Sequence, residues 1–252
     1  MVEGSVGIVV LDRPEVRNAL DGPTVEYLVS ALTEFDASEA IDCIVLTGAD
    51  PAFCAGLDLQ AVASGELDLA GGGPDLCQDF RQIDTPIIGA INGAAVAGGL
   101  ELALLCDFLI ASERATFADT HLKVGVHPSW GLTVHLPRAV GLPMAREMSL
   151  TGRYVRADEA LRIGLVIRVV PHDMLLQSAL EKAVQVSGSA PGIIGELRTT
   201  YREVTGLNLE CGVAVERRRA ARMGYDRASL DGRRMEVLKW GRAQTDSRGV
   251  TP

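Results

Sequence analysis

Residues 90–103, Ala-Ile-Asn-Gly-Ala-Ala-Val-Ala-Gly-Gly-Leu-Glu-Leu-Ala, combine an apolar strand, a turn of small residues and the start of a helix. A helix that begins at such a turn leaves backbone N–H groups unpaired, and its dipole adds partial positive charge there. Such a point can stabilise an oxyanion. Gly98 and Glu101 are three residues apart, so they share one face of the helix. The stretch predicts either an anion hole beside a proton-transfer group or a tight packing turn between helix and sheet.

Strand and helix patterns alternate on both sides of this stretch. Strands are expected at residues 6–11, 41–47, 86–91 and 109–111, and helices at residues 25–37, 98–105, 143–150 and 157–163. Residues 196–252 show helical patterns without strand patterns. A chain of 252 residues that is 47% hydrophobic can bury one full core. These features predict an α/β fold, with a β/α core over residues 1–195 and a helical region over residues 196–252.

A second stretch, residues 43–59, again has the pattern of a strand, a turn with Cys-Ala-Gly at residues 54–56, and a short helix. Asn-Ala-Leu at residues 18–20, Cys-Asp at residues 106–107 and Gly-Leu-Val at residues 164–166 complete an ordered set. In this order the motifs resemble the crotonase (enoyl-CoA hydratase/isomerase) family over nearly the whole chain. The resemblance implies a crotonase-like spiral of repeated ββα units. It also implies a C-terminal helical region for oligomer contacts and site closure, in a homotrimer or a dimer of trimers.

The resemblance implies that the chain binds an acyl-CoA thioester and stabilises an enolate-like anion with two backbone N–H groups. The two donors fall on Leu57 and Gly98. Glu101 matches the first of two glutamates that hold a water molecule in hydratases of the family. CoA enters as part of the substrate, so no separate cofactor is expected. The resemblance also places three residues near the substrate or its CoA moiety: Arg17, Ala55 and Asp58. For Arg17, an ordinary exposed loop position is the alternative.

The position of the second glutamate is occupied by His121, and Trp130 stands in a loop where the family has small residues. Histidine exchanges protons near neutral pH. His121 therefore either positions the water beside Glu101, or fills space and leaves Glu101 as the only acid and base. Asp119 could orient the imidazole, but a surface position is predicted for it. Trp130 either packs in the core or borders the acyl group, where an intruding indole would shorten the acyl channel. Residues 64–73 resemble the mobile segment beside the family's acyl pocket.

The leading expectation is a lyase that adds water across the double bond of a 2-enoyl-CoA. Isomerisation of an enoyl-CoA and hydrolysis of the thioester by water activated at Glu101 are alternatives within the same fold. A non-catalytic acyl-CoA binding protein is the alternative from another class. The chain has no Gly-x-Ser-x-Gly motif, so a serine hydrolase is not expected. Acyl chain length and metabolic pathway stay open, because one fold serves many reactions.

Composition argues against several other classes. No apolar run approaches the length of a membrane span, and acidic residues near the N-terminus do not fit a signal peptide. Five cysteines, an odd number, are expected as reduced thiols in a cytoplasmic protein, with Cys54 a small apolar filler and not a nucleophile. The spacing of His121, His127 and His135 matches no common zinc pattern, so no metal is expected.

Charge is unevenly distributed along the chain. Residues 1–195 carry a net charge of −13 and residues 196–252 a net charge of +4. The arginine cluster at residues 217–222 is predicted to be solvated or to face another subunit. Nucleic acid is not an expected partner, because the whole chain carries a net charge of −9 and no aromatic platform accompanies the arginines.

Overall fold

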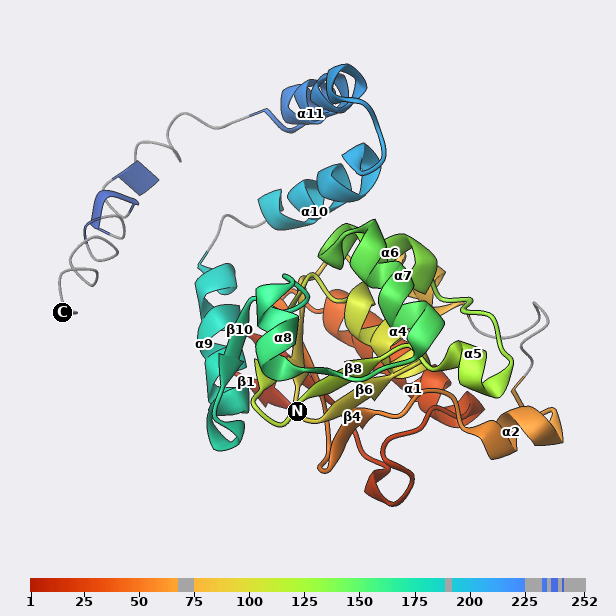
Figure 1. Cartoon of the computed structure of the whole chain (residues 1–252). Helices are drawn as coiled ribbons and strands as arrows, with labels where there is room; N and C mark the ends of the chain where they lie inside the picture. The colour runs from red at the N-terminus through yellow and green to blue at the C-terminus, as the bar shows by residue number, and fades with distance from the viewer. Residues whose placement is uncertain (68–74, 189–191, 225–232, 235–236, 240–241, 243–252) are drawn as a thin grey trace, which may run out of the picture. The chain divides into compact units, whose positions relative to one another are not determined.

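A computed structural model of the chain describes residues 1–67, 75–188, 192–224, 233–234, 237–239 and 242 (Figure 1). The chain divides into two compact units, Met1–Gly195 and Glu196–Pro252. Within the described residues, no helix combines the length and the apolar character needed to cross a membrane.

The larger of two sheets in the first unit has six strands. Their order is β1 (Val2–Glu3), β2 (Val6–Leu11), β3 (Cys43–Gly48), β5 (Ile87–Ile91), β7 (Phe108–Ser112) and β10 (Arg168–Val170). Only the pairing of β1 with β2 is antiparallel. Strands β3 and β5 are buried almost throughout, as expected for parallel strands covered on both faces.

The smaller sheet contains short strands in the order β4 (Ala52–Cys54), β6 (Ala94–Val96), β8 (Thr116–Ala118) and β9 (Val155–Arg156). The pairs β4–β6 and β6–β8 are parallel. From β3 to β8, consecutive strands therefore alternate between the two sheets, and each pair is followed by a helix. The three repeats are β3-β4-α2, β5-β6-α4 and β7-β8-α5, where α2 is Leu59–Ser64, α4 is Gly98–Leu105 and α5 is His121–Val124. This arrangement confirms the predicted spiral of ββα units.

The remaining helices of this part of the chain are α1 (Gly22–Asp36), α3 (Leu76–Gln82), α6 (Leu132–Val140), α7 (Leu142–Thr151), α8 (Ala157–Arg162) and α9 (Leu175–Ser187). Short 3-10 helices occur at Pro14–Val16 and His172–Met174. Helices α10 (Ile193–Val204) and α11 (Leu209–Met223) follow, in agreement with the helical pattern predicted there. The predicted segment at residues 64–73 begins at the end of α2, and its residues 68–73 lie outside the described residues.

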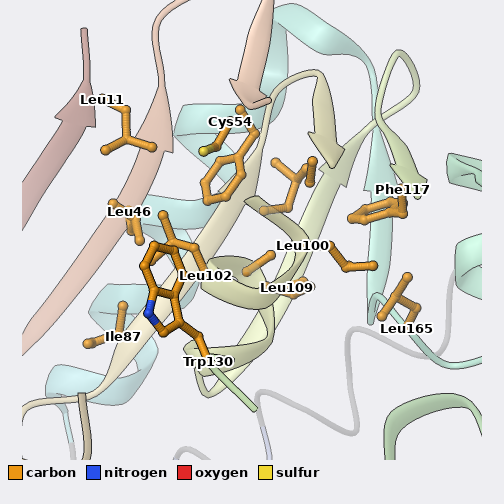
Figure 2. Packing of buried hydrophobic residues seen from close by; sticks show 14 of the residues in the cluster. Leu11, Leu46, Cys54, Ile87, Leu100, Leu102, Leu109, Phe117, Trp130 and Leu165 are labelled. Carbon is orange, nitrogen blue, oxygen red and sulfur yellow. The ribbon is translucent and has the colours of Figure 1, made fainter. Parts of the chain in front are cut away.

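Helix α4 lies in the middle of the core and is buried from Gly98 to Ala103. Figure 2 shows Leu100 and Leu102 of this helix among the buried side chains of the core, which include Leu46 of the larger sheet and Trp130. Gly99 allows the helix to approach β4, since an added Cβ would lie 2.1 Å from the carbonyl oxygen of Cys54. A helix fixed this tightly holds its N-terminus, and whatever binds there, in a defined position.

Candidate active site

The turn after β4 directs the backbone N–H of Leu57 away from its neighbouring chain segment. Leu57 forms an isolated parallel bridge with Leu20. The bridging hydrogen bonds are made by its neighbours: Leu20 N–H donates to the Gly56 carbonyl, and Asp58 N–H donates to the Leu20 carbonyl, both at 2.8 Å. In such a bridge the central residue turns its own N–H to the opposite side. The Leu57 donor therefore faces away from Leu20.

Gly98, the first residue of α4, supplies the second predicted donor. Its N–H has no acceptor within the helix, because the first turn of a helix leaves its donors unpaired. An added Cβ on Gly56 would lie 3.2 Å from the Gly98 nitrogen, and an added Cβ on Gly98 would lie 3.5 Å from the Leu57 nitrogen. The two predicted donor nitrogens thus border one narrow space, which a side chain at residue 56 or 98 would enter. Leu57, Gly98 and His121 all line a cavity of about 100 Å³.

Ala97 makes the sharp connection from β6 to α4. Its backbone has φ 48° and ψ −114°, a region that favours glycine. Its N–H donates to the carbonyl of Ala118 in β8, and its carbonyl accepts from Glu101 N–H. These bonds hold the strained residue in place and aim the start of α4 at the cavity that Ala97 also lines.

The N-terminal segment holds the donor turn from the other side. Asn18 is buried, and its amide nitrogen donates to the carbonyls of Ala49 and Ala52, each at 2.7 Å. The carbonyl of Arg17 accepts from Ala55 N–H at 3.0 Å. The sequence predicts no role for Asn18 in the site, although Asn18 belongs to the Asn-Ala-Leu motif of the family resemblance. Asn18 thus cross-links the segment at residues 13–20 to the connection between β3 and β4, while Arg17 links that segment to the turn after β4.

The three residues expected near the CoA moiety differ in their surroundings. Arg17 is exposed, and Ala55 lines the cavity. Asp58 caps α2 by accepting from Gln60 N–H at 3.0 Å, and its other carboxylate oxygen lies 3.3 Å from the Arg13 guanidinium. Both oxygens of Asp58 therefore serve the fold, and a substrate contact for it stays a prediction.

Glu101 projects from the first turn of α4 and is only 2% exposed. One carboxylate oxygen, Oε1, accepts from the backbone N–H groups of Trp130 and Leu132, at 2.8 and 3.3 Å. The other, Oε2, lies 3.4 Å from Nε2 of His121. Two backbone donors thus orient the side chain and leave one oxygen for proton exchange. These donors come from residues far along the chain and have no side-chain signature in the sequence.

His121 is the first residue of α5 and is 4% exposed. Its Nδ1 lies 2.7 Å from Oδ1 of Asp119, and its backbone N–H donates to the same oxygen at 3.2 Å. The predicted surface position of Asp119 is wrong, because this residue is 2% exposed and turned toward the imidazole. The chain leaves its extended path at His121 to start a helix, which folds the Asp119 side chain back over the helix start.

The charge of His121 follows from these neighbours. Burial lowers the pKa of His121, but its hydrogen bonds and charge interactions with Asp119 and Glu101 outweigh burial and raise that pKa from 6.5 to about 9. The pKa of Asp119 is lowered from its usual value: burial acts to raise it, while hydrogen bonds from His121 and the Ser149 hydroxyl outweigh burial. His121 therefore lies between Asp119 and Glu101 in surroundings that favour its protonated form. A direct role for His121 in holding water stays a prediction.

Trp130 packs in the core, where its side chain is 5% exposed. An added Cβ on Gly98 would lie 3.3 Å from the indole, so Trp130 packs against the start of α4. Cys54 is buried beside the turn, and burial raises the pKa of its thiol to about 12, which fits an inert filler. Among the residues that the structure describes, no group of three or more His, Cys, Asp or Glu side chains could hold a metal ion.

Comparison with known proteins identifies relatives over most of the chain. The family model for enoyl-CoA hydratase/isomerase matches residues 2–238. A probable enoyl-CoA hydratase 1, peroxisomal, of Arabidopsis thaliana is 35% identical over 218 residues, which cover 86% of this chain and 82% of the relative. A carnitinyl-CoA dehydratase of Proteus mirabilis is 38% identical over 218 residues, covering 85% and 83% of the two chains.

Among solved structures, an enoyl-CoA hydratase subunit I of Geobacillus kaustophilus has a TM-score of 0.84 and 32% identity, covering 95% of this chain and 94% of that one. The ββα repeats and the match over nearly all residues lead to one conclusion. The chain belongs to the enoyl-CoA hydratase/isomerase family.

Proposed function

We propose that this protein is an enoyl-CoA hydratase that adds water reversibly and on one face across the double bond of a 2-enoyl-CoA. The observation that carries the proposal is the buried Glu101–His121 pair, whose side chains lie 3.4 Å apart, with His121 lining the cavity that Leu57 and Gly98 also line. The relatives named as a hydratase and as a dehydratase support the same reaction, read in its two directions.

The reaction starts at the thioester carbonyl, whose oxygen accepts hydrogen bonds from Leu57 N–H and Gly98 N–H. These bonds withdraw electrons from the conjugated double bond and make its β-carbon electrophilic. When water adds, negative charge develops on the same oxygen as an enolate. Each preorganised donor contributes about 3 kcal/mol to the stabilisation of such a charge in comparable enzymes.

Proton exchange is divided between Glu101 and His121. Glu101 Oε2 takes a proton from water as the water oxygen bonds to the β-carbon, and the π electrons move to the thioester oxygen. The imidazolium of His121 then gives its Nε2 proton to the α-carbon as the enolate collapses. Glu101 is left protonated and His121 neutral. Transfer of one proton between them, across the 3.4 Å separation, restores the pair. Because Glu101 Oε2 and His121 Nε2 are neighbours, both groups would act on the same face of the double bond.

His121 thus takes the place of the second glutamate of the family, and does so as a proton donor. This assignment replaces the expectation that a neutral imidazole only holds water. It rests on a pKa of about 9, which keeps the imidazole protonated at neutral pH.

We further propose that CoA enters only as part of the substrate, with no separate cofactor. A homotrimer or dimer of trimers, with oligomer contacts from residues 196–252, and a cytoplasmic location remain predictions. Light scattering during size-exclusion chromatography, on the full chain and on a chain ending at Gly195, tests the first of these. The name of the Arabidopsis relative assigns that protein to peroxisomes, so the location of this chain needs its own measurement.

The test of the hydratase proposal follows the loss of the conjugated thioester absorbance with short, medium and branched 2-enoyl-CoA esters. Turnover is expected in the wild type and is expected to fall at least 100-fold in Glu101→Gln and in His121→Ala. Glu113→Gln is the matched control, because Glu113 is exposed and outside the site. Calorimetric binding of a saturated acyl-CoA to each variant identifies the alternative. Tight binding by all variants without turnover in the wild type would make the protein an acyl-CoA binder.

A further inference from the structure

We propose that Asp119 is a positioning residue that holds His121 in the orientation and protonation state needed to donate from Nε2. This inference rests on the proposed hydratase function and extends it to a residue beyond the Glu101–His121 pair. It starts from the line of three buried side chains, in which Nδ1 of His121 faces Asp119 and Nε2 faces Glu101.

The geometry gives each imidazole nitrogen one partner. The Nδ1–Oδ1 distance of 2.7 Å is that of a short charge-assisted hydrogen bond, whereas the Nε2–Oε2 distance is 3.4 Å. Asp119 is therefore the closer partner of the ring. A proton on Nδ1 is held by Asp119, so the proton that the ring can release is the one on Nε2. Nε2 is also the nitrogen that faces Glu101, the group that exchanges protons with it.

Asp119 is itself held in position. Its Oδ1 accepts from both the ring and the backbone N–H of His121, and the Ser149 hydroxyl hydrogen-bonds to the carboxylate. The side chain is 2% exposed, so water does not compete for these bonds. A carboxylate that is buried and bonded to three groups fixes the ring plane as well as its tautomer, as outer partners of functional histidines do elsewhere.

The effect of the Asp119 charge on the protonation of His121 distinguishes a positioning role for Asp119 from a purely structural one. The groups that raise the pKa of His121 are Asp119 next to α5 and Glu101 on α4. Without the charge of Asp119, the imidazolium loses its closer carboxylate and releases its proton at lower pH. A residue that only capped the start of α5 would alter stability without moving this titration.

The test compares the wild type with Asp119→Asn, which keeps the shape of the side chain and removes its charge. We expect kcat for enoyl-CoA hydration to fall at least tenfold, with KM changed less than threefold, because Asp119 does not line the cavity. The alkaline limb of the pH–kcat profile is expected to move down by one pH unit or more. Asp42→Asn is the matched control, since Asp42 is exposed.

Nitrogen NMR of ¹⁵N-histidine protein gives a readout that does not depend on activity. The chain has four histidines, and the His121 signals are those lost in His121→Gln. Imidazolium shifts are expected for His121 at pH 7.5 in the wild type and neutral-ring shifts in Asp119→Asn. Asp119→Ser removes the carboxylate but keeps a side-chain oxygen that can accept from the His121 backbone N–H. It should lower the titration midpoint of His121 in the same direction, which gives a second test if Asp119→Asn does not fold.

Two results would overturn the inference. One is a His121 titration that is unchanged in both Asp119→Asn and Asp119→Ser. The other is a lower kcat in Asp119→Asn with an unmoved pH profile, which would assign Asp119 a purely structural role. Absence of turnover in the wild type would refute the hydratase function alone, because the NMR titration still reports whether Asp119 controls the proton on His121.

Discussion

Replacing Gly98 by alanine is expected to abolish catalysis while leaving the fold intact. The new methyl group would lie 3.5 Å from the Leu57 nitrogen and 3.3 Å from Cζ3 of Trp130. It would therefore stand beside both proposed donors. An oxyanion needs to sit about 2.7–3.1 Å from each donor nitrogen, and the methyl group displaces it from that position.

The size of the effect follows from the number of donors affected. Loss of one oxyanion donor costs about 10²–10³ in kcat, or roughly 3–4 kcal/mol in the barrier. Displacement from both donors should lower kcat/KM by at least this amount. Stability should change by no more than about 1 kcal/mol, because alanine in a helix gains about 0.5–1 kcal/mol over glycine and the tight contact with Trp130 offsets this gain. The midpoint of thermal unfolding should move by no more than about 4 °C.

Steady-state hydration kinetics and differential scanning calorimetry on the same preparation measure the two effects separately. A Gly98→Ala protein that melts with the wild type and retains more than a tenth of its kcat/KM would refute the assignment of the Gly98 N–H as a donor. A protein that fails to fold would refute the stability argument instead, because it would show that the contact with Trp130 cannot relax.

Four other predictions concern residues 57, 97, 99 and 121. Gly99→Ala should prevent folding, because the added Cβ would lie 2.1 Å from the carbonyl oxygen of Cys54, and soluble yield with circular dichroism measures this. Ala97→Gly should raise the free energy of unfolding by about 1 kcal/mol in a denaturant titration, since it relieves a φ of 48°. Leu57→Pro removes the proposed donor and should abolish turnover, whereas Leu57→Ala keeps the donor and should retain most of kcat. Finally, stability should depend on pH through His121, whose pKa is about 9 in the folded protein against a reference of 6.5. Its contribution is fully present below pH 6.5 and is lost as pH rises through 9, so His121→Gln should flatten the fall in unfolding free energy over that range.

Each of these predictions has a result that contradicts it. Normal folding of Gly99→Ala would mean that α4 can withdraw from β4. Equal stability of Ala97→Gly and the wild type would mean that the backbone at residue 97 carries no strain. An active Leu57→Pro variant would exclude this donor, and parallel pH curves for His121→Gln and the wild type would mean that the charge of His121 does not stabilise the fold.

The sequence predicts the repeating architecture well where hydrophobic runs are long, and poorly where they are short. Strand β2 and helix α4 lie where their patterns predict them. The smaller sheet has no such signal, because strands of two or three residues are too short to show an alternation. Helix α6 contains Pro137, which interrupts a helical pattern.

In the site, too, the sequence predicts contacts between residues that are close along the chain and misses those between distant residues. Gly98 and Glu101 are brought together by helical spacing, which the sequence reveals directly. The placement of Asp119 depends on where α5 begins, and a spacing of two residues predicts a shared face only if the chain stays extended. The hydrogen bond from Trp130 N–H to Glu101 joins residues 29 apart through backbone atoms. No residue type is required for such a bond, so no pattern in the sequence could predict it.

The proposed donors beside the cavity are backbone N–H groups. Substitutions that change side chains in the turn therefore differ in effect from those that change the path of its backbone. The turn that carries Leu57 is held by backbone hydrogen bonds to Arg17 and Leu20, none of which uses the side chain at residue 55 or 57. New side chains at those two positions would therefore change the lining of the cavity while the backbone of the turn keeps its hydrogen bonds. In such a scaffold, substrate range is expected to change more readily than the proposed capacity to stabilise an enolate.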